Sequence, residues 1–372
     1  MKTPKLSDIV GIINKIAPPR LAESWDNSGL QVGDPDAVIE RIMVSLDATL
    51  AVMEAALSAS CQLLVTHHPL LFKPLKTLST ATHQGKLVHS AIRGNLAVIS
   101  IHTSYDAAEG GLNDLLAERL GVFGCRPLQP ASGQDLCKLV VFVPGDHLDR
   151  VRTVLFPLAE ALGNYRDCSF SAPGEGTFTP LTGATPFIGA VGSLEKAPEQ
   201  RLELLIERSN LPRAVRALLA AHPYEEPAFD IYPLLNEGKP LGLGRVGSLA
   251  EQTNLADYAG RIKKTLNAPG LRYAGDPAAM VKKVALCSGS GASLLREAAR
   301  YGADVLVTGD VKYHDARDAL DLGIALIDAG HFPSEIIMVD DVAFRLGRQL
   351  SEAGYGNCCT VPCRIESDPL RV

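Results

Sequence analysis

One short motif occurs twice in this chain, once in each half, and the repetition limits the folds that are open to it. The first copy is His102-Thr-Ser-Tyr-Asp106, which follows the apolar run NLAVISI. The second copy is His331-Phe-Pro-Ser-Glu335, which follows GIALIDAG. Both place a histidine directly after a hydrophobic run and a carboxylate four residues later. A chain with such a repeat is expected to contain the same structural unit twice.

The segments around the motif repeat as well. Apolar, strand-like runs alternate with helix-like segments in the same order in both halves. The runs are 41–49, 62–69 and 96–106 in the first half, and 282–291, 304–314 and 324–335 in the second. Strands that alternate with amphipathic helices predict βαβ units on a parallel or mixed sheet. We therefore expect an α/β domain of two lobes that are related by a pseudo-twofold axis.

Histidines and carboxylates gather at the ends of these predicted strands. With the adjacent pair that closes the strand LLVT, the two motifs supply six candidate ligands: His67, His68, His102, Asp106, His331 and Glu335. Sheets of this kind bind ligands beyond the carboxyl ends of their strands, and divalent metals accept imidazole together with carboxylate. A strand-end histidine can equally be structural, but the repeat and the His-His pair favour a metal role. Six ligands predict a dinuclear centre, with Glu335 as the bridging carboxylate.

Charge and hydropathy argue against two classes of protein. A net charge of -6 disfavours a general nucleic-acid binder, which needs a basic surface. The N-terminus lacks the apolar segment and cleavage site of a signal peptide, and no stretch is long enough to cross a bilayer. We therefore expect a cytoplasmic protein without a membrane partner. The eight cysteines are expected to be core or surface residues. For Cys358, Cys359 and Cys363 we expect strand and loop positions, with a metal or redox role as the alternative.

The repeat is interrupted between the two halves. Residues 128–241 follow a pattern of their own, and Gly and Pro cluster at both margins, as expected where an inserted domain enters and leaves. We predict, in order, a strand at 138–144, a helix at 147–162, a pair of strands within 165–180, helices at 199–208 and 212–222, and a strand at 228–235. We interpret the order as that of a ferredoxin-like α+β unit. The expected division is 1–127 and 242–372 for the lobes of the metal-binding α/β domain, and 128–241 for the insert. His222 and Tyr224 could gate or sense a ligand there, with a surface turn as the alternative.

Five motifs are spread along the chain: ESWDNSGLQVG, THHPLLF, HTSYDAAEGGLN, GDVKYHDA and GHFPSE. Together they resemble the Nif-three-like dinuclear metal-centre hexameric family, whose members are often labelled GTP cyclohydrolase 1 type 2 homologs, and the likeness covers nearly the whole chain. The middle segment is similar to the insert of the family's long form, which resembles CutA and PII domains. The resemblance implies a toroidal homohexamer with metal pairs facing an internal cavity. It carries His67, His68, Asp106, His331 and Glu335 onto the metal role, whereas His102 matches a position that is a ligand in only some descriptions of the family.

Three classes of function remain open at this point. The chain could be a metal-dependent hydrolase, such as a GTP cyclohydrolase acting on a nucleotide or another small molecule. It could be a metal-binding, metal-trafficking or regulatory protein whose insert senses a ligand, or a scaffold. Converging histidines favour the first two, and the ligand set accepts two divalent ions per subunit, whether zinc, iron, manganese, cobalt or nickel.

Two further segments lie close to the predicted ligands. Asp310 and Lys312 stand where His67-His68 stand in the first half. They are candidates to support the ligands or contact substrate, with a helix cap and a solvated lysine as the alternative. The segment from Trp25 to Gly29 is expected to be a structural turn.

Overall fold

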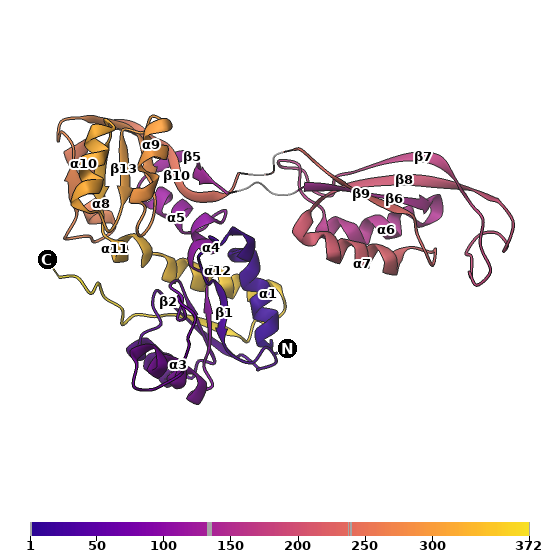
Figure 1. Cartoon of the computed structure of the whole chain (residues 1–372), viewed down its shortest axis with the longest axis horizontal. Helices are drawn as coiled ribbons and strands as arrows, with labels where there is room; N and C mark the ends of the chain where they lie inside the picture. The colour runs from indigo at the N-terminus through magenta and orange to yellow at the C-terminus, as the bar shows by residue number, and fades with distance from the viewer. Residues whose placement is uncertain (1, 132–135, 237, 239, 372) are drawn as a thin grey trace. The chain divides into compact units, whose positions relative to one another are not determined.

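The computed structural model describes residues 2–131, 136–236, 238 and 240–371. It divides the chain into two compact units, residues 1–131 with 241–372 and residues 132–240 (Figure 1). The chain leaves the first unit after Ala131 and returns to it at Leu241. The Ala131 amide donates a hydrogen bond to the Leu241 carbonyl oxygen at 2.8 Å. The second unit is therefore inserted between two neighbouring points of the first.

The first unit contains two β-sheets. In spatial order, the first sheet consists of β1 (Gly29–Val32), β4 (Ala97–Ser100), β3 (Leu63–Thr66), β2 (Arg41–Ser45) and β15 (Cys359–Pro362). The second sheet consists of β11 (Arg272–Ala274), β14 (Ala325–Asp328), β13 (Val305–Thr308), β12 (Met280–Leu286), β10 (Gly242–Asn254) and β5 (Val122–Pro130). The order β1-β4-β3-β2 in one sheet matches the order β11-β14-β13-β12 in the other. In both, the first strand of the order is antiparallel to its neighbour, and the other three strands run parallel to one another. The mixed α/β fold expected from the alternating pattern is therefore present.

Each half of the first unit also gives one strand to the other half's sheet. Strand β5 comes from the N-terminal half but pairs with β10 in the second sheet. Strand β15 comes from the C-terminal half but pairs in parallel with β2 in the first sheet. A division of the chain at 127 and 242 does not describe this exchange. The sequence repeat reveals only the elements that both halves share, and these two strands lie outside it.

Helices cover both sheets. They are α1 (Leu6–Ile16), α2 (Leu50–Ser58), α3 (His83–Arg93), α4 (His102–Ala107), α5 (Leu112–Arg119), α8 (Leu255–Thr265), α9 (Leu295–Arg300), α10 (Tyr313–Asp321), α11 (His331–Glu335) and α12 (Met338–Glu352), with short 3-10 turns η1 (Pro19–Leu21) and η5 (Ala292–Leu294). Side-chain oxygens of Thr49, Thr82 and Asn254 accept backbone hydrogen bonds at the starts of α2, α3 and α8. Such caps satisfy amide groups that a helix start leaves unpaired.

One continuous core joins the two halves of the first unit. It includes Val44 and Val65 from the first sheet, Leu286 and Val305 from the second, and Leu346 from α12. Separate clusters under α2 and α3, and under α9, fill the opposite sides of the sheets. Strands β3 and β13 are buried along their whole length. Parallel strands covered on both faces take this form, which explains their continuous apolar sequences.

The inserted unit forms a four-stranded antiparallel sheet with helices. The strand order is β7 (Ser169–Phe178), β8 (Glu195–Glu207), β6 (Leu136–Pro144), β9 (Phe229–Pro233). The helices are α6 (Leu148–Leu155) and α7 (Leu211–Ala221), with 3-10 turns η2 (Gly145–His147), η3 (Phe156–Leu158) and η4 (Arg208–Asn210). Its core cluster is made only of residues between Leu139 and Phe229.

One predicted helix of the insert is wrong. Residues 199–208 were expected to be helical, because Glu, Gln and Leu favour a helix, yet 195–207 form β8. Along this strand Leu202, Leu204 and Ile206 are buried while their neighbours are more exposed. That alternation is the period of a strand, and packing on the sheet outweighs the local preference. The pair of strands expected within 165–180 is correspondingly a single strand, β7, with β8 as its partner.

Two expectations about the rest of the chain can be compared with the structure. Within the described part of the chain, no helix has the length and apolar character needed to span a membrane. Cys359 begins β15, and the buried residues Cys358 and Cys363 flank this strand. All eight cysteines are free thiols.

The insertion geometry predicts that the first unit folds without the second. Ala131 and Leu241 are hydrogen-bonded neighbours on antiparallel strands, so a two-residue Asn-Gly turn can replace residues 132–240. We expect the shortened chain to unfold cooperatively and to keep its metal-binding capacity, as measured by circular dichroism and metal titration. A product without cooperative unfolding would show that the insert is required for the fold.

Candidate metal centre

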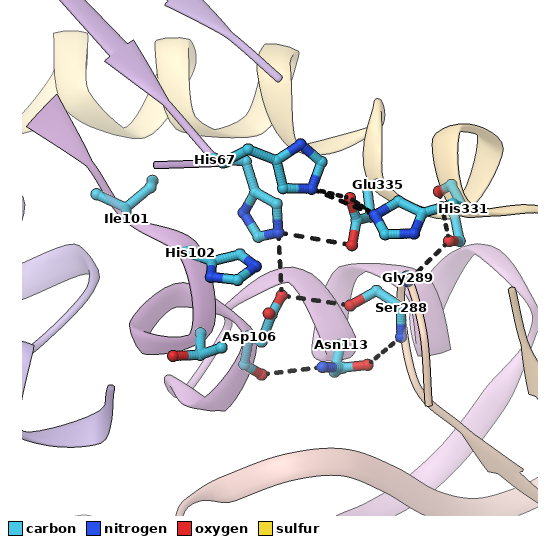
Figure 2. A network of polar contacts seen from close by, with 12 residues as sticks. His67, Ile101, His102, Asp106, Asn113, Ser288, Gly289, His331 and Glu335 are labelled. Carbon is cyan, nitrogen blue, oxygen red and sulfur yellow. Dashed lines mark hydrogen bonds and ion pairs between the residues drawn. The ribbon is translucent and has the colours of Figure 1, made fainter. Parts of the chain in front are cut away.

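All six predicted side chains come together within the first unit (Figure 2). His67 and His68 directly follow β3, whose end lies beside the ends of β2 and β4. Each His-x-x-x-acid motif forms a short helix that starts at its histidine: α4 in the first half and α11 in the second. Residues four apart lie on the same face of a helix, so each motif directs its imidazole and its carboxylate the same way.

Glu335 lies at the centre of the group. Only 3% of the residue is exposed. Its Oε2 atom is 3.0 Å from His68 Nε2 and 3.0 Å from His331 Nε2, and Oε1 is 3.6 Å from His67 Nε2. The two imidazole nitrogens, His68 Nε2 and His331 Nε2, are themselves only 3.2 Å apart. The carboxylate therefore links histidines from both halves of the unit.

His67 and Asp106 complete the buried side of the site. His67 is fully buried, and its Nε2 atom is 3.6 Å from Asp106 Oδ1. Among the residues that the structure describes, neither ring nitrogen of His67 has a hydrogen-bond partner, and Glu335 Oε2 meets hydrogen-bond geometry with neither nearby imidazole. Buried polar atoms normally have partners. Unpaired nitrogens and a carboxylate oxygen that face one another fit a site for a cation.

Three aspartates orient three of the imidazoles from behind. Nδ1 of His68 is 2.8 Å from Asp47, Nδ1 of His102 is 2.9 Å from Asp26, and Nδ1 of His331 is 2.7 Å from Asp310. An ionised carboxylate only accepts hydrogen bonds, so each Nδ1 carries the proton and donates it. In a neutral ring the Nε2 atom then has a free lone pair directed toward the centre. Histidines that ligate metals are commonly held in this way.

The charges of the site influence one another strongly. Burial works to raise the pKa of Glu335, but the nearby imidazoles of His67, His331 and His68 hold it well below its usual range. Burial raises the pKa of Asp106. Burial opposes protonation of His68, yet its contacts with Asp47 and Glu335 raise its pKa to about 10. Contact with Glu335, offset by burial, raises the pKa of His331 to about 9. The site strongly favours positive charge beside Glu335.

Residues from both halves surround Asp106 and Glu335. The Ser288 hydroxyl donates to Asp106 Oδ1 at 3.3 Å, and the Asn113 amide donates to the Asp106 carbonyl oxygen at 3.1 Å. Gly289 has φ +57°, and a Cβ atom there would lie 2.1 Å from Glu335 Oε1. Only glycine combines this left-handed conformation with the close approach of the carboxylate.

The donor atoms form two groups that share one histidine. His67, His68 and His102 make the first, and His68, His331 and Glu335 make the second; within each, the ligand atoms lie within 4.8 Å of one another. Imidazole nitrogen and carboxylate oxygen are suitable donors for zinc and for other divalent transition metals. The residues present therefore fit metal binding by donor type, by burial and by their unpaired atoms.

The structure also places the residues near these ligands. Asp310 contacts His331 and is therefore a supporting residue, whereas Lys312 is the exposed residue at the start of α10, where its amide donates to Asp315. The segment from Trp25 to Gly29 is more than a turn, because Asp26 accepts hydrogen bonds from Thr103 and contacts His102.

Asp26 and Asp47 were missed by sequence reasoning. Asp47 is the second residue after β2 just as His68 is the second residue after β3, and that strand-end position was the available signal.

Comparison with known proteins agrees with this arrangement. Residues 4–368 match the model of the family described as Duf34/NIF3 (NGG1p interacting factor 3). A Halalkalibacterium halodurans protein named GTP cyclohydrolase 1 type 2 homolog is 38% identical over 371 residues, which cover 100% of this chain and 99% of that protein. A Bacillus subtilis protein of the same name is 39% identical and covers 94% of this chain and 93% of its own length. The crystal structure of a Bacillus cereus protein related to NIF3 superposes with a TM-score of 0.92 at 36% identity and covers both chains completely. The chain therefore belongs to the Duf34/NIF3 family.

Proposed function

We propose that this protein binds two divalent metal ions per chain and uses them as a metal-dependent hydrolase. The observation that carries the proposal is the convergence of four imidazoles and two carboxylates, three of whose imidazoles are oriented by aspartates. The name GTP cyclohydrolase 1 type 2 homolog, which relatives carry, supports a hydrolytic reaction on a nucleotide or a similar small molecule.

The residues divide naturally between two ions. His67, His102 and Asp106 would hold one, and His331 would contribute to the other, with Glu335 bridging both. His68 lies within reach of both groups, and its single Nε2 lone pair would bind one of the two ions. When bound, a pair of divalent ions supplies Lewis acidity for the hydrolysis of a phosphoester, an amide or a purine ring. Because Nδ1 of three rings faces aspartate, this chain presents Nε2 to the ions and fixes the ring planes.

Access for a substrate is from the side of His68 and His331. Their side chains are 25% and 34% exposed, whereas that of His67 is fully buried at the base of the site. Trp25 and Phe72 are exposed beside His102, with the Trp25 ring 5.8 Å from the imidazole. These aromatic surfaces favour a substrate with a flat or apolar part, which they would orient by stacking.

The alternative is a metal-binding, metal-trafficking or regulatory protein without turnover. The same ligands would serve it, and the exposed His68–His331 side would allow metal exchange. Turnover distinguishes the two functions, because a carrier releases its ions to a partner without converting a small molecule.

The resemblance of the sequence motifs supports three further proposals. The active form would be a toroidal homohexamer in the cytoplasm, and the insert would be a CutA- or PII-like domain. Exposed aromatic residues of the first unit, such as Phe123 on β5 and Phe344 on α12, provide apolar surface that an assembly of several copies would cover.

Glu335→Gln tests the bridging role. The change keeps the side chain's size but removes the charge that faces three imidazoles. After anaerobic purification, we expect wild-type protein to contain two metal ions per chain and to hydrolyse a substrate in a screen of GTP, phosphoesters and small amides. The variant should lose at least one ion per chain and all turnover, as measured by elemental analysis and product detection.

Glu352→Gln is the matched control for this experiment. Glu352 is exposed on α12, where it pairs with Arg348, so the same chemical change should alter neither metal content nor activity. Circular dichroism must show that both variants are folded. Two tightly held ions in Glu335→Gln would refute the bridge, and metal retention without turnover by the wild type would favour the trafficking function.

The three orienting aspartates should affect the ions selectively. Asp26→Asn acts through His102 and should lower the affinity for one ion. Asp310→Asn acts through His331 and should lower the affinity for the other. Asp47→Asn acts through His68, whose single Nε2 lone pair serves one ion, and should weaken binding of that ion alone. Residues of this kind change metal affinity by about tenfold to a hundredfold. Competition titration with a chelator measures each step, and the exposed Asp36→Asn variant is the control. If each of the three changes lowered the affinity for both ions equally, the assignment of these ligands to two separate ions would be contradicted.

A further inference from the structure

A second site with ligand-binding character lies entirely within the inserted unit. An open cavity of about 820 Å³ is lined by β7, the loop that follows it, β8, and residues 224–228. Cavities that hold small molecules range from roughly 300 to 1,000 Å³. None of its lining residues belongs to the first unit, so it is separate from the metal centre.

Aromatic rings form one wall of this cavity. The Tyr224 ring lies 5.9 Å from that of Phe178 and 6.1 Å from that of Phe187, between centroids. Phe187 is 53% exposed although it is large and apolar. The Tyr224 hydroxyl is buried, and no described residue meets hydrogen-bond geometry with it, while burial and the nearby Glu199 carboxylate raise its pKa. A ligand with an apolar group and a polar end would cover the Phe187 ring with its apolar group and give the Tyr224 hydroxyl a hydrogen-bond partner.

His222 fixes the position of this wall. Its Nε2 donates to the Phe142 carbonyl oxygen at 2.9 Å, and its Nδ1 accepts from the Tyr224 amide at 3.1 Å. Both ring nitrogens are therefore occupied, and burial lowers the pKa of His222, which favours the neutral ring that these bonds require. His222 is a positioning residue for Tyr224 and does not itself face a ligand.

The charge in the cavity is negative. Glu199 lines it and is only 9% exposed, and Glu225 and Glu226 lie at its edge. A Cβ atom on Gly176 would lie 2.2 Å from Glu199 Oε2, so the glycine of β7 leaves room for this carboxylate. Arg201, which also lines the cavity, pairs with Glu203 at 2.8 Å, and Glu203 pairs with Lys138 as well. Within the described residues, no basic side chain lies within ion-pair distance of Glu199 or Glu225.

A buried carboxylate without a cationic partner is costly, and aromatic rings attract cations through their faces. We propose that this cavity binds an organic cation, namely an ammonium group attached to an apolar or aromatic body. The ammonium group would lie against Glu199 and the Tyr224 ring, and the apolar body would lie among Phe178 and Phe187. A metal ion suits the cavity less, because the clusters of metal-ligating side chains among the described residues all lie in the first unit.

Calorimetric titration of the full-length protein with three probes of matched shape tests this proposal. The probes are phenethylammonium, its neutral analogue 2-phenylethanol, and the anion 3-phenylpropanoate. Hydrogen bonds to charged groups contribute about 1.5 to 3 kcal/mol, which corresponds to roughly a tenfold to hundredfold change in affinity. We expect phenethylammonium to bind more tightly than the alcohol by a factor in this range, and the anion not to bind.

Variants separate the contributions of charge and ring. Glu199→Gln should weaken phenethylammonium binding by about tenfold or more and leave binding of the alcohol unchanged. Glu225 is exposed at the edge of the cavity, where its carboxylate accepts from the Thr185 amide, and Glu225→Gln should weaken binding of the cation to a smaller extent. Phe187→Ala should weaken binding of the cation and binding of the alcohol to a similar extent. Asp149→Asn removes an exposed charge of α6 outside the cavity and should change nothing.

Three results would overturn the proposal. One is equal binding of cation and alcohol, and another is tighter binding of the anion. The third is absence of probe binding together with a changed molar mass of Phe187→Ala in light scattering, which would identify the cavity as a contact between copies of the chain. If Glu199→Gln does not fold, as judged by circular dichroism, the Glu225→Gln and Phe187→Ala variants decide between these outcomes. Because no residue of the metal centre is involved, failure here leaves the proposed hydrolase unaffected.

Discussion

The buried carboxylate of Glu335 is the contact on which the rest of the first unit depends. A charge in a protein interior is unfavourable unless it is paired. Glu335 finds its partners on both sides, His67 and His68 from the N-terminal half and His331 from its own helix. The two halves must therefore close on each other before this charge is compensated. The same closure brings the imidazoles and carboxylates together as a group of donor atoms that fits a metal ion.

The remainder of the fold is arranged to keep the halves closed. Each half lends one strand to the other's sheet, β5 in one direction and β15 in the other. Arg245 of β10 is almost fully buried and binds Asp114 and the Ala108 carbonyl oxygen, both from the N-terminal half. Loss of one partner from such a buried pair typically costs about 3 to 5 kcal/mol. The geometry of the site is thus set by backbone pairing and buried charge, and does not depend on flexible loops.

Much of this arrangement could be predicted from sequence, for physical reasons. The strands that end in Val-Thr, β3 and β13, are continuous apolar runs because both faces are buried, and a repeat of such runs is easy to recognise. His67 and His68 directly follow β3, and His331 lies just beyond β14, the neighbour of β13 in the second sheet. Local patterns therefore predicted that the six side chains would meet, although they could not supply distances or protonation.

What could not be predicted depends on contacts between distant residues. Asp26 is 76 residues from His102 along the chain, and no local pattern indicates that they meet. The exchanged strands have no counterpart in the repeat. Residues 199–208 have the composition of a helix, and only their place in the inserted sheet makes the alternation of Leu202, Leu204 and Ile206 decisive.

The most direct measurement is anomalous X-ray scattering from crystals of metal-loaded protein, recorded on both sides of the absorption edge of the bound metal. The account predicts two anomalous peaks per chain, both between the ends of β3 and the helices α4 and α11, with Glu335 next to both. A single peak there, or peaks only elsewhere, such as at Cys358, Cys359 and Cys363, would contradict it.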